Sequence, residues 1–306
     1  MQINSTILWT PRDLDVFLVL AETGSFRRTA SQVHLSQSAV SGVIARLEDT
    51  LSARLFDRTT RSVHLTTAGH AFAEQARLIR AQTLEALQSV RRITELQTGQ
   101  LRMAALPSLA ATVIPKIMAR FTLQFPGVSL TLHDTLSGPA FELVRAGTVD
   151  LAITAANPDY ADLDYEPLSA DSFVLLLHPD HPLAASSAPV DWLQTAGLTH
   201  ISMPRPASVR QYADAAFIQH RIVFSPHYEV EHIATIHAMV RSGLGVAALP
   251  ELAAAFVQQG GVVSRKLTHP DIQRPIGLVT KRNRSLSPAA QEMVRMLKQE
   301  IGHPPA

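Results

Sequence analysis

The sequence of 306 residues predicts an α/β protein whose N-terminal part is an all-α head with a β-hairpin wing. Two observations lead to this fold class. Apolar residues recur at helical spacing as far as Gly99, and beyond Leu101 short apolar segments alternate with amphipathic ones, as in βαβ units. The length also favours two or three compact units over a single core.

The composition excludes several classes of protein. The chain has no cysteine, which rules out a disulfide framework, a thiol nucleophile and a thiolate metal site. No apolar run approaches the roughly 18 residues of a membrane helix, and the first residues lack the basic and apolar regions of a secretory signal. These features predict a cytoplasmic protein that does not enter a membrane. The net charge of +1 is uninformative about nucleic acid, so that evidence has to come from local patterns.

The first two helices have clear starting signals. Thr10, with Asp13 three residues later, predicts the start of the first helix, and Gly24 predicts its end. Ser25 is then expected to cap a short second helix over residues 26–34.

A third helix is expected after Ser36, and its two sides differ sharply. The side expected to be buried consists of Val40, Val43, Ile44, Leu47 and Leu51. The opposite side, near the helix start, carries the short and uncharged residues Gln37, Ser38, Ser41 and Gly42. Such a side suits entry into a major groove, where it can bond base edges or phosphates. Two helices with a tight turn and an exposed polar turn at the start of the second describe a helix-turn-helix.

The segment after the third helix is predicted to be a β-hairpin wing. Short strands at residues 55–56 and 63–65 flank residues 59–62, with Arg58 and Arg61 near the tip. Two arginines beside a recognition helix are suited to a phosphate or minor-groove contact, although a two-arginine turn taken alone is usually ordinary surface.

Seven residues of the head are predicted to contact DNA. Arg28 lies in the first turn of the second helix, where a cation opposes the helix dipole. An external anion would explain this position, and a solvated side chain without a partner explains it equally well. The residues expected to face bases, phosphates or the minor groove are Arg28, Gln37, Ser38, Ser41, Arg58, Thr60 and Arg61.

One long helix is predicted from Thr67 to about Leu96, ended by Gly99. Its apolar residues alternate steps of four and three, which is a heptad seam: Phe72, Ala76, Ile79, Thr83, Ala86, Val90 and Ile93, widened by Leu84 and Leu87. A long helix that packs on its own domain would show the same pattern.

The remaining two hundred residues predict two α/β units. A βαβαβ order implies a parallel sheet with helices on its faces: strands near 101–105, 128–132 and 150–154, with helices near 111–125 and 139–146. A second unit follows the strands at 166–177, with helices near 210–220 and 233–242 and strands near 228–231 and 245–249. The strand at 274–281 and the helix at 288–301 have no neighbours of their own and are expected to return to the first unit.

The head resembles the winged helix-turn-helix of LysR-type transcriptional regulators. The shared segments, in order and at the family spacing, are SQSAVS, LE, RLFDR and LTTAG. Two positions depart from the family pattern: Gly42 stands where a basic or long polar residue is frequent, and Ser52 stands where glycine is favoured. Later segments, among them RAGTVDLAI, RSGLGVAALPE and RPIGLVTK, resemble the effector-binding domain of the same family.

The resemblance implies a domain organisation. It divides the chain into a DNA-binding domain at 1–66, a dimerising linker helix at 67–98 and an effector-binding domain at 99–306. The last is similar to periplasmic solute-binding proteins, with lobe I at about 99–161 and 268–306 and lobe II at about 162–267. The two crossovers between the lobes would fall near residues 162–168 and 265–272.

The same resemblance places a small-molecule site in the cleft between the lobes. Ligands of such sheets bind beyond the carboxyl ends of strands, where helix N-termini attract polar and anionic groups. The candidate effector-binding residues are Ser108, Leu109, Thr135, Ser137, Ser202, Met203 and Thr235. Each serine or threonine alone is more often a helix cap than a ligand contact, so their convergence rests on the resemblance.

No enzyme motif accompanies these features. The thirteen histidines lack the His-Glu-x-x-His spacing, and a Gly-x-Ser-x-Gly elbow, a P-loop and a dinucleotide fingerprint are missing. The sequence therefore predicts a LysR-type regulator without catalytic residues, metal or cofactor. Its expected partners are double-stranded promoter DNA and a small, anionic effector. Further copies of the chain in a homodimer or homotetramer are also expected, with RNA polymerase as a further candidate partner. The alternatives are a solute-binding protein with a helical extension and no DNA function, and a small-molecule enzyme in the clamshell.

Overall fold

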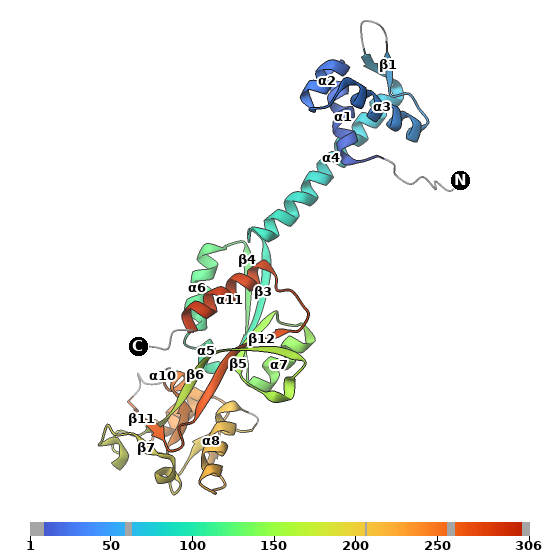
Figure 1. Cartoon of the computed structure of the whole chain (residues 1–306). Coiled ribbons are helices and arrows are strands. Elements are labelled where there is room, and N and C mark those ends of the chain that lie inside the picture. Colours follow the sequence, from blue (N-terminus) through green and yellow to red (C-terminus); the bar gives the residue numbers. More distant parts are fainter. Residues whose placement is uncertain (1–8, 59–62, 206, 256–260, 302–306) are drawn as a thin grey trace. The chain divides into compact units, whose positions relative to one another are not determined.

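The computed structural model describes residues 9–58, 63–205, 207–255 and 261–301 (Figure 1). The chain folds as two compact units that divide between Arg92 and Ile93. The fold class is confirmed: a helix-turn-helix head with a two-stranded wing, a long linker helix and an α/β domain. None of the helices in these described ranges is long and apolar enough to cross a membrane.

The head contains three short helices whose ends follow local sequence signals. The helices are α1 (Pro11–Thr23), α2 (Phe26–Gln32) and α3 (Gln37–Leu51). Thr10 and Asp13 form a reciprocal capping box before α1, and Gly24 ends that helix at φ 59°. Ser25 and Ser36 cap the next two helices, as predicted.

The wing and the linker helix complete the core of the head. Strands β1 (Phe56–Arg58) and β2 (Val63–Leu65) pair antiparallel, and α4 (Thr67–Thr94) follows. The Phe17 ring lies 5.3 Å from that of Phe56 and 4.9 Å from that of Phe72, so α1, the wing and α4 meet there. Gly69 is required at this junction because a Cβ would lie 2.1 Å from the carbonyl oxygen of Leu55.

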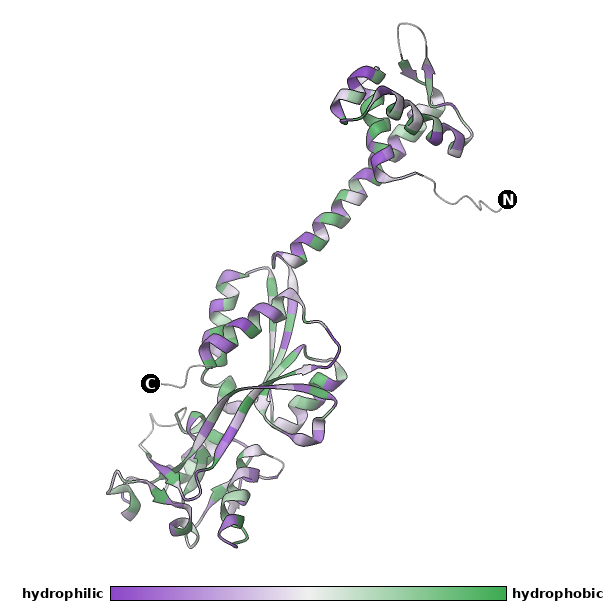
Figure 2. Cartoon of the chain, viewed as in Figure 1, coloured by the Kyte–Doolittle hydropathy of each residue, from purple (hydrophilic) through white to green (hydrophobic). Residues whose placement is uncertain are grey.

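The predicted heptad seam of α4 divides into two parts. Ala76 is buried, and Phe72 and Ile79 pack against the core of the head. The first turns of α4 therefore pack within their own unit. Further along, Leu84 and Leu87 expose about half of their surface. Figure 2 shows hydrophilic and hydrophobic residues alternating along this part of the helix.

The second unit is built on one large mixed sheet, with strand order β4-β3-β5-β12-β6-β11-β7 and β10 paired to β6. Its first three strands are parallel, as predicted: β3 (Gly99–Ala105), β4 (Val128–Asp134) and β5 (Leu151–Ala155). The strand β12 (Gln273–Lys281) adds antiparallel beside β5, so the C-terminal segment returns to the first three strands as expected.

Helices cover both faces of these strands. On one face α6 (Ile114–Gln124) and α11 (Pro288–Ile301) lie side by side, and α7 (Ser137–Ala146) covers the other (Figure 1). The helix expected at 111–125 begins at Ile114, three residues later than predicted, and the short helix α5 (Pro107–Ala110) precedes it. Proline at the start of both α5 and α6 explains the break, since it favours the first turn of a helix and not its interior.

A second hydrophobic core forms from residues between Phe173 and Leu267. The long strand β6 (Leu163–Leu177) joins the two cores: residues 163–172 pair with β12, and its end pairs with β10 and β11. The other elements of this core are β7 (Val190–Asp191), β8 (Ile201–Ser202), α8 (Ser208–Gln219), β9 (Tyr228–Glu229), α9 (Ile233–Arg241), β10 (Ala247–Pro250), α10 (Glu251–Ala255) and β11 (Val263–Thr268). We call the part around this core the second lobe and the part around strands β3–β5 the first lobe.

Candidate DNA-binding and effector sites

Helix α3 is anchored on one side and polar on the other. Val40, Val43, Ile44 and Leu47 are buried as predicted, whereas Leu51 at the helix end exposes 38% of its surface. Gln37 and Ser38 are exposed, and Ser41 is half-buried. The Ser36 hydroxyl lies 2.9 Å from that of Ser38 and accepts a hydrogen bond from the Ala39 amide.

The three arginines and the threonine predicted beside α3 are only partly within the described residues. Arg28 is exposed, and its Nη2 donates to the carbonyl of Thr23, the last residue of α1. A cation at that helix C-terminus interacts favourably with the dipole of α1, which is a partner that the sequence did not reveal. Arg58 ends β1, while Thr60 and Arg61 lie outside the described residues.

Two charged residues of α3 that sequence reasoning missed fix its position in the head. Arg46 Nη2 donates to Asp13 Oδ1 at 3.2 Å, and Asp13 Oδ2 accepts from the amide and hydroxyl of Thr10. Desolvation alone would raise the pKa of Asp13, but these hydrogen bonds and the Arg46 charge lower it overall. Glu48 Oε1 accepts from the amides of Leu55 and Phe56 at 2.8 and 3.2 Å, which ties the wing to α3.

Two adjoining cavities lie between residues of the first lobe and residues of the second. The inner cavity has a volume of only about 10 Å³, and its mainly apolar walls are formed by Leu106, Pro107, Ser108, Leu136, Met203, Ala207, Ser208, Val209, Ile233 and Arg274. The outer cavity, of about 170 Å³, is formed by Pro107, Ser108, Ala111, Asp134, His232, Ile233 and Ala234. Pro107, Ser108 and Ile233 line both.

The structure brings only some of the seven predicted effector residues to these cavities. Ser108 lines both and Met203 lines the inner one. Ser137 lines a third cavity, of about 410 Å³, with Tyr160 and Gln211. Leu109 packs in the core of the first lobe.

The other predicted effector residues lie outside these three sets of lining residues. Ser202 is buried, Thr135 is half-buried and Thr235 is exposed on α9. The Ser137 hydroxyl is also committed within its lobe, because it donates to the Ala155 carbonyl and accepts from Thr154.

A buried ion pair lies behind Ser108 and was not predicted. Arg274 Nη2 is 2.7 Å from Asp171 Oδ2 and donates to Ser108 Oγ at 3.1 Å. Asp171 Oδ1 accepts from the amide of Leu252 in the second lobe. Desolvation lowers the pKa of Arg274, and the Asp171 charge opposes this. Because an arginine only donates, Ser108 accepts from it and keeps its own hydroxyl proton available to a ligand.

Three helices of nine or more residues begin at these cavities without a side-chain cap: α7, α8 and α9. Unsatisfied amides at helix N-termini attract hydrogen-bond acceptors and anions. Asp134 lines the outer cavity, and its carboxylate would repel an anion. Desolvation raises the pKa of its carboxyl, opposed by the charge of His232 on the other lobe.

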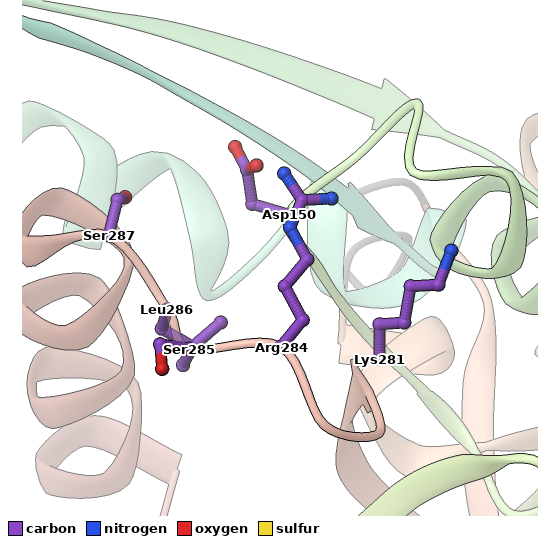
Figure 3. A pocket seen from close by; sticks show the side chains of 6 residues that line it. All are labelled: Asp150, Lys281, Arg284, Ser285, Leu286 and Ser287. Atoms are coloured by element: carbon purple, nitrogen blue, oxygen red, sulfur yellow. The ribbon is translucent and has the colours of Figure 1, made fainter.

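A fourth cavity, of about 170 Å³, lies near the start of α11 (Figure 3). Three of its polar side chains already form hydrogen bonds within the fold. Lys281 Nζ donates to the Arg145 carbonyl, Asp150 accepts from the Arg102 amide, and Ser287 accepts from the Ala290 amide.

Comparisons with known proteins identify both parts of the chain. Residues 11–70 match the family model of the bacterial regulatory helix-turn-helix protein, lysR family, and residues 94–302 match the LysR substrate binding domain. The uncharacterized HTH-type transcriptional regulator YfeR of Shigella flexneri is 33% identical over 92% of this chain and 91% of its own.

Solved structures have the same fold. The full-length regulator CbnR in complex with its target DNA matches with a TM-score of 0.67, at 19% identity over 96% of this chain and 100% of CbnR. The effector-binding domain of QuiR in complex with shikimate matches with a TM-score of 0.61, at 19% identity over 67% of this chain and 97% of that domain. The chain therefore belongs to the LysR family of transcriptional regulators, a family of DNA- and effector-binding proteins and not of enzymes.

Proposed function

We propose that this regulator binds a two-fold-related DNA site through α3 of two copies, acts in the cytoplasm, and is controlled by a small anionic effector between its lobes. The observation that carries the DNA part is the exposed polar start of α3. Its opposite side is buried, and Arg46 and Glu48 anchor it to α1 and the wing. A helix held this firmly can present side chains to a groove at little cost in conformational entropy.

The proposed roles divide between base and backbone contacts. Gln37, Ser38 and Ser41 would face bases in the major groove, where a glutamine suits adenine and serine suits several bases. The contacts to phosphates or the minor groove would come from Arg28, Arg58, Thr60 and Arg61.

The proposed effector is a small molecule with an anionic head and an apolar body. Three uncapped helix N-termini favour the head, and the apolar residues Pro107, Ala111 and Ile233 of the outer cavity favour the body. Arg274 is already paired with Asp171, which favours a single negative charge over several. The complex of the QuiR domain with shikimate supports this class of ligand. The candidate contacts are Ser108, Leu109, Thr135, Ser137, Ser202, Met203 and Thr235, within the lobe boundaries given above.

The proposed assembly is a homodimer through α4, or a tetramer of two such dimers. The exposed Leu84 and Leu87 support a second helix on this face. A dimer also suits the modest charge of each head, because two linked heads gain affinity without stronger individual contacts.

Selection of duplexes from a random pool by the full chain, followed by fluorescence anisotropy, tests the DNA assignment. Gln37→Ala is expected to relax the base preference at one position of each half-site. Arg61→Ala is expected to weaken binding to all duplexes and to reduce the salt slope by about one phosphate contact. An unaltered selected motif and an unaltered slope would contradict the assignment.

A further inference from the structure

Gly42 occupies an unfavourable place in the head. It is the sixth residue of α3, in the interior of a 15-residue helix. Glycine weakens a helix interior more than any residue except proline, because it loses the most backbone freedom on folding. A glycine at such a position therefore calls for a reason.

The chain itself supplies no such reason within its described residues. The backbone of Gly42 is helical and is not among the positive-φ glycines. A Cβ at this position would meet nothing closer than Arg46 Nη1 at 3.9 Å, an ordinary contact. By contrast, a Cβ at Gly69 or Gly245 would lie within 2.3 Å of a backbone oxygen. Those two glycines are required by the fold, and Gly42 is not.

Gly42 lies on the side of α3 that faces away from the core of the head. It shares the helix side of Ser38, Ser41 and Ala45, at spacings of four, one and three residues, opposite the buried Val43 and Ile44. The one long side chain in contact range is Arg46, whose guanidinium is paired with Asp13. Gly42 and Ser41 are half-buried, whereas Ser38 and Ala45 on the same side of the helix are exposed.

We infer that Gly42 is a specificity-determining residue whose missing side chain lets the backbone of α3 approach base edges in the major groove. The inference rests on the proposed function, in which this side of α3 enters DNA. Side chains as short as serine reach base edges only when the helix backbone comes close. A methyl group at residue 42 would then occupy the space needed by the base pair.

The test compares two variants that both improve α3. Gly42→Ala adds the best helix former, and Ser52→Gly relieves the left-handed φ of 49° at the C-cap. Both are expected to raise the Tm of the full chain, because each removes a local cost. Ser52 lies at the far end of α3 from the polar start, so Ser52→Gly is the matched control.

The binding probe is a duplex that the wild-type chain selects from a random pool, with a scrambled duplex of equal length beside it. Gly42→Ala is expected to weaken binding to the selected duplex by about tenfold or more, the size of an overpacked contact. Its binding to the scrambled duplex and its salt slope should stay unchanged, since no phosphate contact is lost. Ser52→Gly should bind both duplexes like the wild type.

The other outcomes of these measurements overturn either the role of Gly42 or the proposed function. Unchanged affinity of Gly42→Ala for the selected duplex overturns the inference, and so does a lowered Tm, which would show an internal role for the glycine. Weaker binding with a shallower salt slope would assign residue 42 to phosphate instead of bases. If Gln37→Ala is also without effect, or if the wild-type chain selects no duplex, the proposed function fails as well. An effect of Gln37→Ala alone leaves that function intact and refutes only the role of Gly42.

Discussion

At the scale of single residues, the second lobe contains a histidine whose protonation the fold disfavours. His200 is buried, with its ring edge-on to Phe217 and Phe224 at 5.5 and 5.1 Å. Its Nε2 donates to the Thr195 carbonyl at 2.8 Å. Desolvation lowers the pKa of His200, although that hydrogen bond opposes the shift. A proton on this ring would therefore be costly.

We expect the chain to lose stability as the pH falls below about 6.5, the ordinary value for histidine. The unfolded chain takes up a proton there, whereas folded His200 does so only at lower pH. Unfolding is thus favoured by acid, and the full stability is present above that value. Urea unfolding at several pH values should show a weaker acid dependence for His200→Gln, with the exposed His70→Gln as control. Equal acid dependence in all three chains would contradict the prediction.

A second prediction at this scale concerns the ion pair behind Ser108. Arg274→Met leaves Asp171 buried without its partner and should lower the free energy of unfolding by about 3–5 kcal/mol. The double variant Arg274→Met with Asp171→Leu should recover most of that loss, because an apolar pair does not need charge compensation. Urea unfolding measures both. A double variant as unstable as the single one would show that the pair contributes more than mutual neutralisation.

At the scale of elements, only about the first half of α4 packs against the head. Its first turns are buried in the head, and Leu84 and Leu87 are exposed beyond them. Exposed leucines at a spacing of three residues form a continuous apolar surface on a helix. This surface is the one that a second copy of α4 would cover.

Replacement of both leucines by glutamine is expected to shift the chain towards the monomer, because the apolar area that a partner helix would bury is lost. Sedimentation velocity over a range of concentrations measures the change. Val223→Gln, at a more exposed apolar residue of the second lobe, is the control. An unchanged association constant for the α4 variant would place the interface elsewhere.

The elements that sequence reasoning predicted well are those with local signals. The Thr10 capping box, Gly24 and the seam of α4 all lie within a few turns of the helix that they define. The start of α6 was predicted three residues early, at Ala111, because the preference of Pro115 for the first turn of a helix was not used. In the cleft, Ser108 was predicted but Arg274 was not, because 166 residues separate them and the pairing of β5 with both β3 and β12 brings them together.

At the scale of the whole molecule, the outer cavity of the α/β unit combines residues of both lobes, so a ligand there contacts both at once. Such a ligand binds the folded chain and not the unfolded one, and it therefore stabilises the folded state.

Thermal-shift measurements on the full chain with shikimate and other small monocarboxylates are expected to yield a stabilising ligand. Ser108→Ala should reduce its shift. Asp134→Asn should enlarge it, because the substitution removes a like charge from the outer cavity. Asp180→Asn, in an exposed turn, is the control. Stabilisation by amines alone, diminished in Asp134→Asn, would contradict an anionic effector, and indifference to a broad panel would contradict the sensor role.

The return of β12 and α11 to the first lobe has a consequence for the order in which the protein can be made. The second core consists of one continuous stretch of chain, whereas the first combines residues before position 156 with residues after position 275. During synthesis the second lobe can therefore fold first. Until β12 has been made, the edge of β5 that pairs with it stays unpaired. Any truncation between the two would leave that edge open to strands of other chains.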